Sequence, residues 1–347
     1  MSRITPTLLC LTCLVLLGST CPGTPSIPGT TLPAPVGAQS LFDELWLKFD
    51  EKYSYFTYKD IDWDDVLVRY RSEFAADLTP DEFVDKLLPM LGELHDWHVD
   101  VQRANGTWES TTPETYEKNY PETPRNKYLK AGEVYHALGN NTVRHAWFQN
   151  NIAYIRVDSF TGDAFANISD ADIENIFATY QTADGIIFDI RPNNGGDETI
   201  AAKFTSHFTD LTQLYGYTET RNGPGHDDFD PLEDHELSPS NGTLFLGEAV
   251  CLIGPRCMSS AEWCTLMMRA CPNVMLIGDT TRGASGDPEV FGLSNGVNYK
   301  LSRWIAYTDF FFEIEDVGID PDIFVAPPGF DANGDYVIEE AIQQLTT

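Results

Sequence analysis

The chain has 347 residues, and its 22 lysine and arginine residues against 53 aspartate and glutamate residues give a formal net charge of −31. Binding to nucleic acid or to anionic lipid head groups needs clustered basic residues, so this balance argues against both partners. A hydrophobic content of 42%, with 12% aromatic residues, is ample for a packed core and excludes general disorder.

The first 40 residues predict an export signal followed by a flexible linker. The apolar run 8–17 stands behind Arg3. It is shorter than the roughly 20 residues that span a bilayer and is typical of a secretory signal peptide. We therefore expect a signal peptide over 1–20, a linker over 21–40, and a secreted, periplasmic or extracellular protein with no integral membrane span. A buried N-terminal helix and a lipid anchor at Cys21 are the alternatives.

Residues 41–99 predict a small helical domain. Apolar residues recur at helical spacing in its first helix, at Phe42, Leu45, Trp46 and Phe49. A second helix is expected over 63–74. A third begins at Thr79, which caps the helix, and the proline after it takes the first helical position. The polar residues 100–146 have no long period, and we interpret them as a bridging segment.

From residue 147 onwards, apolar strands alternate with helices. The expected strands are 152–157, 185–190, 249–254 and 274–279, and the expected helices are 170–180, 198–208, 260–270 and 336–345. Near-continuous apolar strands are buried on both faces, in a parallel or mixed sheet. Two hairpin-like strands are also expected, over 297–306 and 310–315. The pattern predicts an α/β core over 147–347.

A serine stands at the most informative position of this core. Ser259 follows the strand 249–254 and a tight turn, and directly precedes the helix 260–270. A hydroxyl there points out of the carboxyl edge of the sheet, where ligands of α/β proteins bind, and the first N–H groups of the helix favour a nearby anion. Both features suit a serine nucleophile. The alternative is structural, because Ser259 and Glu262 also form an S-x-x-E capping box.

Two other segments carry groups suited to the same chemistry. Gly195 and Gly196 follow a buried strand, let the backbone approach a ligand closely and offer N–H donors to an oxyanion. His95, Asp96 and His98 end the helical domain. A histidine there could be the base that a serine nucleophile requires, a metal ligand, or a structural residue.

Carboxylates near the C-terminus are a further candidate. Glu313, Glu315 and Asp316 precede a glycine and a proline. One of them could orient a catalytic histidine, as the third member of a catalytic triad does. The alternative is a solvent-facing alternation on an edge strand.

Cysteines and an acidic loop complete the candidates. The core contains Cys251, Cys257, Cys264 and Cys271. They show no C-x-x-C spacing, which argues against a structural zinc site, while disulfides and burial as small apolar side chains both stay open. The loop 221–240 is more typical of a solvated face than of a metal site. Its candidate ligands are His226, Asp227, Asp228, Asp230 and His235.

Four motifs taken in chain order resemble the tail-specific (C-terminal processing) serine protease family, in its tricorn-core-like branch. They read LHDWHV at 94–99, DIRPNNGG at 189–196, SSAE at 259–262 with TTRG at 280–283, and EDVGIDPD at 315–322. The resemblance runs from residue 42 to the end of the chain. Four ordered motifs are far more specific than any one of them.

The resemblance implies a ClpP/crotonase-like α/β core behind an N-terminal helical domain, and no metal or organic cofactor. Its nucleophile would be Ser259, with Ser260 as the near alternative. His98 would be the general base, and Glu315 would align it, directly or through an intermediary. The chain would then be an exported serine endopeptidase that acts on peptides or unfolded protein.

The same resemblance implies an oxyanion hole made by the N–H groups of Ser260 and of Gly195 or Gly196. Two departures from the family pattern stand out. Ala284 replaces the lysine base of the processing branch, so the Ser/Lys dyad is absent, and Trp97 replaces a serine that supports the histidine in tricorn-like sites. Such a tryptophan could narrow the cleft, change specificity or mark a loss of activity.

Two points follow for the choice of function. The bridging segment is too short for the PDZ module that processing proteases often carry, so recognition of substrate C-termini through such a module is not expected. The alternative function is a catalytically inactive scaffold of the same fold that binds a hydrophobic ligand or peptide. The aromatic run 307–312 would then line its apolar pocket, or else pack in the core.

Overall fold

The structure, a computed structural model, describes residues 37–112 and 116–347. The predicted signal peptide and most of the predicted linker lie outside the described residues. Within the described ranges, no helix is long and apolar enough to cross a membrane.

The helical region consists of α1 (Ala38–Lys52), α2 (Trp63–Tyr70) with a 3₁₀ turn (Arg71–Phe74), and α3 (Pro80–Gly92). The predicted apolar stripe of α1 faces inward, and its members Phe42, Leu45, Trp46 and Phe49 have no exposed surface. Thr79 caps α3 as the sequence predicts, because its side-chain oxygen accepts the N–H of Glu82 at 3.4 Å, and the Glu82 carboxylate accepts the N–H of Thr79 at 2.9 Å in return. The three predicted helices are confirmed.

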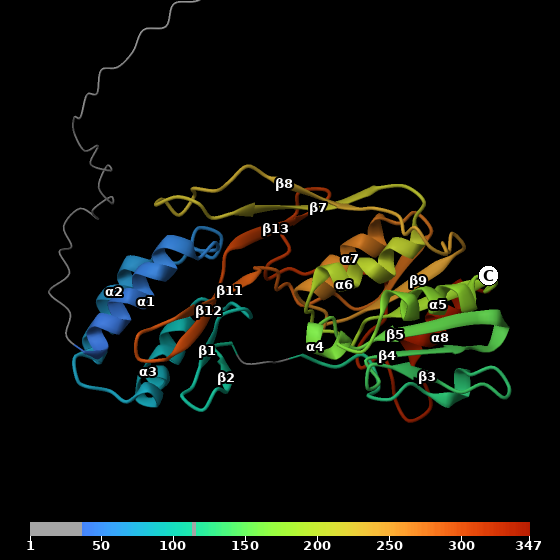
Figure 1. The fold of residues 1–347 in the computed structure, drawn as a ribbon, viewed down its shortest axis with the longest axis horizontal. Helices are drawn as coiled ribbons and strands as arrows, with labels where there is room; N and C mark the ends of the chain where they lie inside the picture. Colours follow the sequence, from blue (N-terminus) through green and yellow to red (C-terminus); the bar gives the residue numbers. More distant parts are fainter. Residues whose placement is uncertain (1–36, 113–115) are drawn as a thin grey trace, which may run out of the picture. The chain divides into compact units, whose positions relative to one another are not determined.

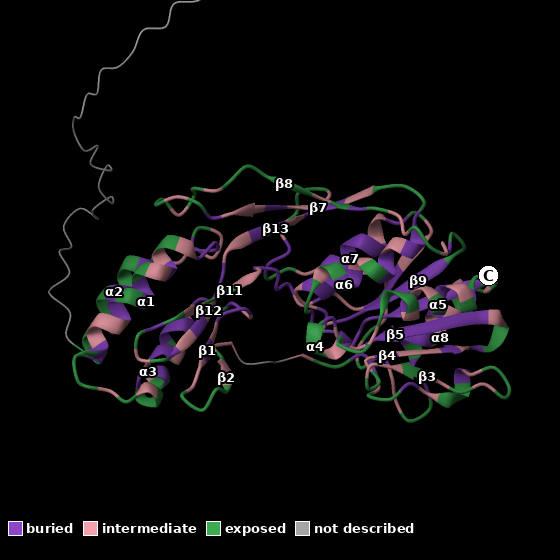
Figure 2. Cartoon of the chain, viewed as in Figure 1, coloured by how far each residue is buried: buried purple, intermediate pink, exposed green. Residues whose placement is uncertain are grey.

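A seven-stranded mixed sheet forms the centre of the core (Figure 1). Its order is β14 (Ile323–Phe324), β10 (Val274–Gly278), β9 (Ala249–Ile253), β6 (Gly185–Asp189), β5 (Ile152–Val157), β4 (Val143–Trp147) and β3 (His136–Leu138). The strands from β14 to β5 run parallel, and β4 and β3 add to them antiparallel. Every residue of β5, β6 and β9 is buried, as the apolar runs predict (Figure 2).

Helices cover both faces of this sheet. The helices are α4 (Gly162–Phe165), α5 (Asp170–Tyr180), α6 (Glu198–Thr205) with a 3₁₀ turn (Ser206–Phe208), α7 (Ser260–Ala270) and α8 (Tyr336–Gln344). Ile186 and Phe188 of β6 share a cluster with residues of α5, α6 and α7, whereas Ile187 shares one with residues of α8. Alternation along the strand therefore separates the two layers. The predicted α/β core behind a helical region is confirmed.

Two smaller antiparallel sheets connect the core with the helical region. One contains β11 (Pro288–Gly292), β12 (Asn298–Ser302), β1 (Asp100–Gln102) and β2 (Trp108–Ser110), and the other β13 (Trp304–Thr308), β7 (Gln213–Thr220) and β8 (Glu233–Leu237). Phe49 of α1 stacks on Tyr299 of β12, with ring centroids 5.7 Å apart. β1, which follows α3, therefore pairs with β12, which follows α7, although about 200 residues separate the two strands in the sequence.

The predicted hairpin near the C-terminus is only partly present. The chain turns back after β13, where the Thr308 N–H donates to the Phe312 carbonyl oxygen at 2.9 Å and the Ile314 N–H to the Ala306 carbonyl oxygen at 3.2 Å, but the predicted strands are wrong. Residues 297–306 do not form one strand, because β12 and β13 belong to different sheets. Residues 310–315 form no strand and make one isolated bridge, between Tyr307 and Glu313. Phe310, Phe311 and Phe312 are all exposed, so they do not belong to the core, although Phe311 and Phe312 line a surface pocket away from Ser259. Aromatic composition favours a strand only where a partner surface buries the side chains.

The four cysteines of the core are buried and unpaired. Two of them donate weak hydrogen bonds to backbone oxygens, Cys257 to Ile190 at 3.2 Å and Cys271 to Met267 at 3.3 Å. Burial raises the pKa of the Cys257 thiol to about 12. These side chains behave as small apolar residues of the core, which decides between the two alternatives.

Candidate active site

Ser259 lies in a sharp turn between the carboxyl end of the sheet and α7. Its φ of 55° and ψ of −129° belong to a region that non-glycine residues rarely adopt. Its backbone N–H donates to the Ala284 carbonyl oxygen at 2.7 Å and to the Glu262 carboxylate at 3.2 Å. Such strain costs on the order of 1–3 kcal/mol and persists only where surrounding contacts impose it. The turn therefore presents Ser259 at the edge of the sheet.

Glu262 does more than cap α7. Its carboxylate also accepts the hydroxyl of Thr281 at 2.7 Å and the N–H groups of Gly283 at 2.7 Å and Ala284 at 3.0 Å. Burial raises its pKa to about 7, against the lowering effect of these hydrogen bonds. The S-x-x-E motif thus connects the turn of Ser259 with the T-T-R-G segment.

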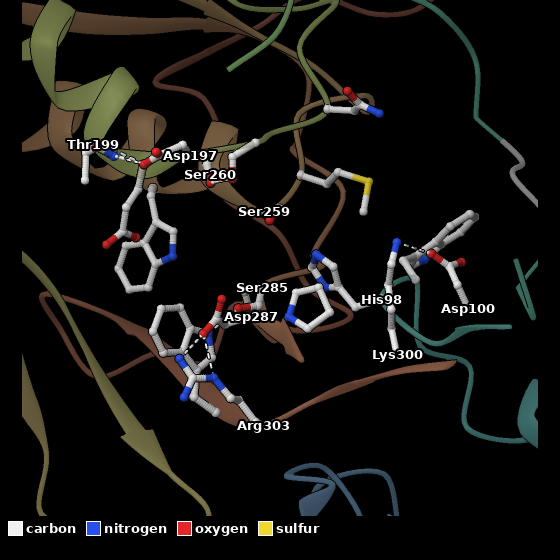
Figure 3. A pocket seen from close by; sticks show the side chains of 18 residues that line it. His98, Asp100, Asp197, Thr199, Ser259, Ser260, Ser285, Asp287, Lys300 and Arg303 are labelled. Carbon is white, nitrogen blue, oxygen red and sulfur yellow. Dashed lines mark hydrogen bonds and ion pairs between the residues drawn. The ribbon is translucent and has the colours of Figure 1, made fainter. Parts of the chain in front are cut away.

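The two adjacent serines have different partners. The hydroxyl of Ser260 is buried and donates to the Gly196 carbonyl oxygen at 2.8 Å. Ser259 is partly exposed and lines a pocket of about 660 Å³ (Figure 3). The geometry therefore favours Ser259 over Ser260 as the reactive hydroxyl.

Gly195 and Gly196 allow the chain to approach this turn closely. A Cβ atom on Gly195 would lie 2.8 Å from the Met258 carbonyl oxygen and 2.9 Å from Ser259 Cβ. A Cβ atom on Gly196 would lie 2.2 Å from the backbone of Phe160. Both positions require glycine.

Only one of these glycines has a free N–H group. Gly195 donates its N–H to the Asn193 side-chain oxygen at 2.8 Å, so it is not an oxyanion donor in this arrangement. Gly196 lines the pocket, and over the described parts of the chain its N–H and that of Ser260 make no hydrogen bond. The two free N–H groups are the candidate oxyanion donors.

His98 lines the same pocket from the loop that follows α3 (Figure 3). Its side chain is buried, and burial lowers its pKa although the charges of Asp96 and Asp100 oppose this. Its backbone N–H donates to Asp96 Oδ1 at 2.7 Å, which shapes the loop. A lowered pKa keeps the imidazole neutral, as a general base must be. Among the residues described, no hydrogen bond joins the Ser259 hydroxyl to the imidazole.

The contact made by His98 Nδ1 defines the tautomer of the ring. Nδ1 accepts the N–H of Gly286 at 3.3 Å. With Nδ1 as the acceptor, the neutral ring carries its proton on Nε2. A ring that receives a proton on Nε2 must first exchange to the other tautomer. The hydrogen bond from Gly286 is long, so losing it costs little, and tight catalytic hydrogen bonds often form only with substrate bound.

Among the residues described, no hydrogen bond joins Glu315 to His98, and of the two predicted arrangements this geometry fits the one with an intermediary. Glu315 accepts the N–H of Ser285 at 3.1 Å, and the next residue, Gly286, donates to His98. Burial, followed by the charge of Asp96, raises the pKa of Glu315 well above its ordinary value. The backbone of 285–286 is thus the link between this carboxylate and the imidazole.

Lys59 is a residue of this site that the sequence did not indicate. Its amine is buried and lies 3.1 Å from Glu315 Oε1 and 2.7 Å from Asp316 Oδ2, and it donates to the His95 carbonyl oxygen at 3.2 Å. Burial lowers the pKa of Lys59, but the charges of Glu315 and Asp96 outweigh it and raise the pKa. No local pattern marks it, because a lysine after an amphipathic helix is normally exposed.

Trp97 has a defined partner that the sequence did not reveal. The guanidinium of Arg282 lies 4.3 Å from the ring centroid of Trp97 and 4.3 Å from that of Tyr116. The same arginine donates to the Pro255 carbonyl oxygen at 2.8 Å. Trp97 thus lines the pocket of Ser259 while its ring stacks on the Arg282 side chain.

The two histidines of the acidic loop contact other side chains of the protein. His226 pairs with Asp50 at 2.8 Å, and His235 contacts the Thr218 hydroxyl at 2.8 Å. In residues 37–112 and 116–347, no three His, Cys, Asp or Glu side chains are grouped to hold a metal ion. The two histidines therefore have structural partners.

Family models match two parts of the chain. The model of peptidase family S41 matches residues 151–325, which include the central sheet and Ser259. The model of the tricorn protease C1 domain matches residues 38–92, which form the helical region.

Comparisons with individual proteins agree with the family models. The carboxy-terminal processing protease CtpB of Bacillus subtilis (strain 168) is 22% identical over 196 residues, which are 56% of this chain and 38% of that protein, so the chain spans well under half of that relative. A crystal structure of a putative peptidase from Parabacteroides merdae is 30% identical with a TM-score of 0.79 and covers 90% of this chain and 98% of its own. Mature CPAF, at 11% identity, 89% and 97% coverage and a TM-score of 0.68, shows similarity of fold alone.

Proposed function

Because the chain belongs to peptidase family S41, the serine peptidase family that its four motifs predict, we propose that it is an active, exported serine endopeptidase. Its substrates are peptides or unfolded protein. Export rests on the apolar run 8–17 of the sequence. The enzyme uses Ser259 as nucleophile and His98 as general base.

The observation that carries this proposal is the position of Ser259. It is held at positive φ at the start of α7, in the pocket that His98 also lines, while the neighbouring hydroxyl of Ser260 is bound to Gly196. Strained backbone at the end of a buried strand is a feature of reactive serines. A serine that only caps a helix does not require a strained backbone.

The reaction follows from these positions. Ser259 Oγ attacks the substrate carbonyl carbon as its proton passes to His98, and the resulting oxyanion accepts the N–H groups of Ser260 and Gly196. His98 then gives the proton to the leaving amine, and water hydrolyses the acyl-enzyme by the same route in reverse. Each oxyanion donor contributes about 3 kcal/mol to the transition state.

Glu315 acts indirectly in this mechanism. The base reaches its productive tautomer when Nδ1 holds a proton and no longer accepts from Gly286. Glu315 and Lys59 hold the segment 285–286 and the loop of His95 in place on either side of the imidazole, so they shape its surroundings in both tautomers without touching the reacting atoms. We therefore assign Glu315 as a positioning residue.

The alternative of an inactive scaffold for a hydrophobic ligand has less support. The pocket beside Ser259 contains carboxylates, a lysine and an arginine, and an apolar ligand would remove these charged groups from water without offering them a hydrogen bond. The aromatic residues Phe310, Phe311 and Phe312 do not line that pocket and are exposed.

Labelling with a fluorophosphonate, with the modified peptide located by mass spectrometry, tests the proposal. We expect stoichiometric label on Ser259 in the wild type and in Ser260→Ala, and none in Ser259→Ala or His98→Ala. Label that survives Ser259→Ala but not Ser260→Ala would move the nucleophile by one residue. Absence of label on folded wild-type protein would contradict an active enzyme.

A further inference from the structure

The charged side chains of the Ser259 pocket are mostly paired with one another. Lys300 lies 3.1 Å from Asp100, and Arg303 lies 2.5 Å from Asp287. Asp197 accepts the N–H of Thr199 at 2.8 Å and caps α6 (Figure 3). The basic groups are therefore neutralised by their partners and do not offer a free cation to a substrate.

Glu198 is the carboxylate that remains. It lines the pocket and is half-buried, and it forms no hydrogen bond or ion pair with any residue of the described chain. Burial raises its pKa, and so do the charges of Asp287 and Asp197. A carboxylate removed in part from water, with no cation beside it, is stabilised by an incoming positive charge.

Two tryptophans line the pocket together with this carboxylate. The rings of Trp263 and Trp304 have centroids 6.0 Å apart and planes at 83°. The indole of Trp304 is fixed by a hydrogen bond to the Ser285 carbonyl oxygen, and Trp263 is almost fully buried. The two rings contact each other edge to face, so the buried Trp263 supports the partly exposed ring of Trp304. A flat aromatic surface of this kind accommodates a methylene chain and attracts a cation at its end.

Trp263 and Glu198 lie close to the reacting atoms because they belong to the same segments of the chain as Ser259 and Gly196. Trp263 is one helical turn beyond Ser259 on α7, and its N–H donates to the Ser259 carbonyl oxygen at 3.2 Å. Glu198 stands two residues after Gly196, the candidate oxyanion donor. A side chain of the substrate residue next to the cleaved bond therefore reaches this part of the pocket.

We propose that Glu198, Trp263 and Trp304 form a subsite for a lysine or arginine side chain of the substrate, next to the cleaved bond. This specificity rests on the proposed serine endopeptidase function. The long stem of the basic residue packs along the partly exposed ring of Trp304, and its cation pairs with Glu198. An acidic side chain would meet an unpaired negative charge, and an apolar one would leave that charge buried.

Peptidyl diphenyl phosphonates measure this preference directly. The serine oxygen forms a bond to phosphorus, phenoxide leaves, and the serine proton ends on the released phenol, so the rate of inactivation reports the side chain held beside the nucleophile. Lysine and norleucine compounds differ in charge but little in shape. We expect the lysine compound to inactivate the wild type at least tenfold faster, and the two rates to agree within twofold in Glu198→Gln.

A matched variant and an independent label separate the possible failures. Glu233→Gln removes an exposed carboxylate that also acts on Glu198 through space but does not line the pocket, and it should keep the tenfold preference. A small fluorophosphonate should label Ser259 equally in all three proteins. Equal phosphonate rates in a wild type that takes this label, or a preference that survives Glu198→Gln, would overturn the subsite alone. A wild type without label would overturn the proposed function and the subsite with it.

Discussion

The two halves of the candidate site are built in different ways. The nucleophile half, with Ser259, Ser260 and Gly196, consists of a strand, two tight turns and a helix within the α/β core. The base half collects His98, Lys59 and Glu315 from three distant segments and buries a neutral imidazole near an ion pair. The first half owes its geometry to backbone constraints, and the second to long-range electrostatic contacts.

This difference teaches where each half is vulnerable. Substitution in the nucleophile half should change chemistry or local strain with modest effects on stability. Substitution in the base half should change stability and chemistry together, because a buried charge that loses its partner is expensive. The following expectations are ordered from the largest effect to the smallest.

The two halves should act as one unit in the chemical step. Ser259→Ala and His98→Ala should each lower kcat for a peptide substrate by as much as about 10⁶-fold, and the double variant should be scarcely worse than either. Ser260→Ala, which keeps its backbone N–H, should cost at most about tenfold, since it loses one neutral hydrogen bond. Steady-state kinetics on purified proteins measures all four. Multiplicative losses in the double variant would contradict a joint proton transfer.

Lys59→Met tests how much the buried ion pair of the base half contributes to the stability of the protein. It leaves Glu315 and Asp316 without their cation, and the free energy of unfolding should fall by about 3–5 kcal/mol. Lys48→Met is the matched control, because Lys48 pairs with Glu51 at an exposed position and should cost no more than about 1 kcal/mol. Urea denaturation gives both values. An equal loss of unfolding free energy in the two variants would show that the buried ion pair stabilises the protein no more than the exposed one.

The pH dependence of kcat/KM should reflect the protonation of His98. Burial lowers the pKa of His98, so the imidazole stays neutral below its ordinary value near 6.5. The acid limb of kcat/KM should therefore lie below pH 6.5, with rate lost tenfold per unit beneath the pKa of the base. Fluorophosphonate inactivation rates measured from pH 4 upwards check this without a substrate that titrates. A limb centred above pH 6.5 would argue against a buried neutral base.

Ser259→Gly should reveal the strain of the nucleophile half. Glycine adopts positive φ without steric cost, so relief of strain should outweigh its greater entropy when unfolded, and the protein should gain about 1 kcal/mol. Ser259→Ala retains the backbone requirement and should gain nothing. Thermal unfolding of the two inactive variants makes the comparison. A less stable glycine variant would mean that the turn is not strained by its side chain.

Sequence predicted the nucleophile half far better than the base half. Buried strands, a capping serine and paired glycines are local signals, and they led to Ser259, Ser260 and Gly196 in one pocket. The use of the Gly195 N–H by Asn193 was missed, because a side chain two residues away competes for the same donor.

The base half depends on contacts that no local pattern encodes. His98 contacts Gly286 and Lys59 contacts Glu315 although each pair is far apart in the sequence, and no local pattern indicates that the lysine is buried. The strand expected over 310–315 failed for the related reason that no surface covers its three phenylalanines. Tertiary burial decided both cases.

A crystal structure of the phosphonylated protein tests the central claim most directly. The account predicts a bond from Ser259 Oγ to phosphorus, a phosphonyl oxygen that accepts the N–H groups of Ser260 and Gly196, and His98 Nε2 within hydrogen-bond distance of the adduct. The Gly195 N–H should remain on Asn193. An adduct on another residue, or a phosphonyl oxygen directed away from both N–H groups, would contradict it.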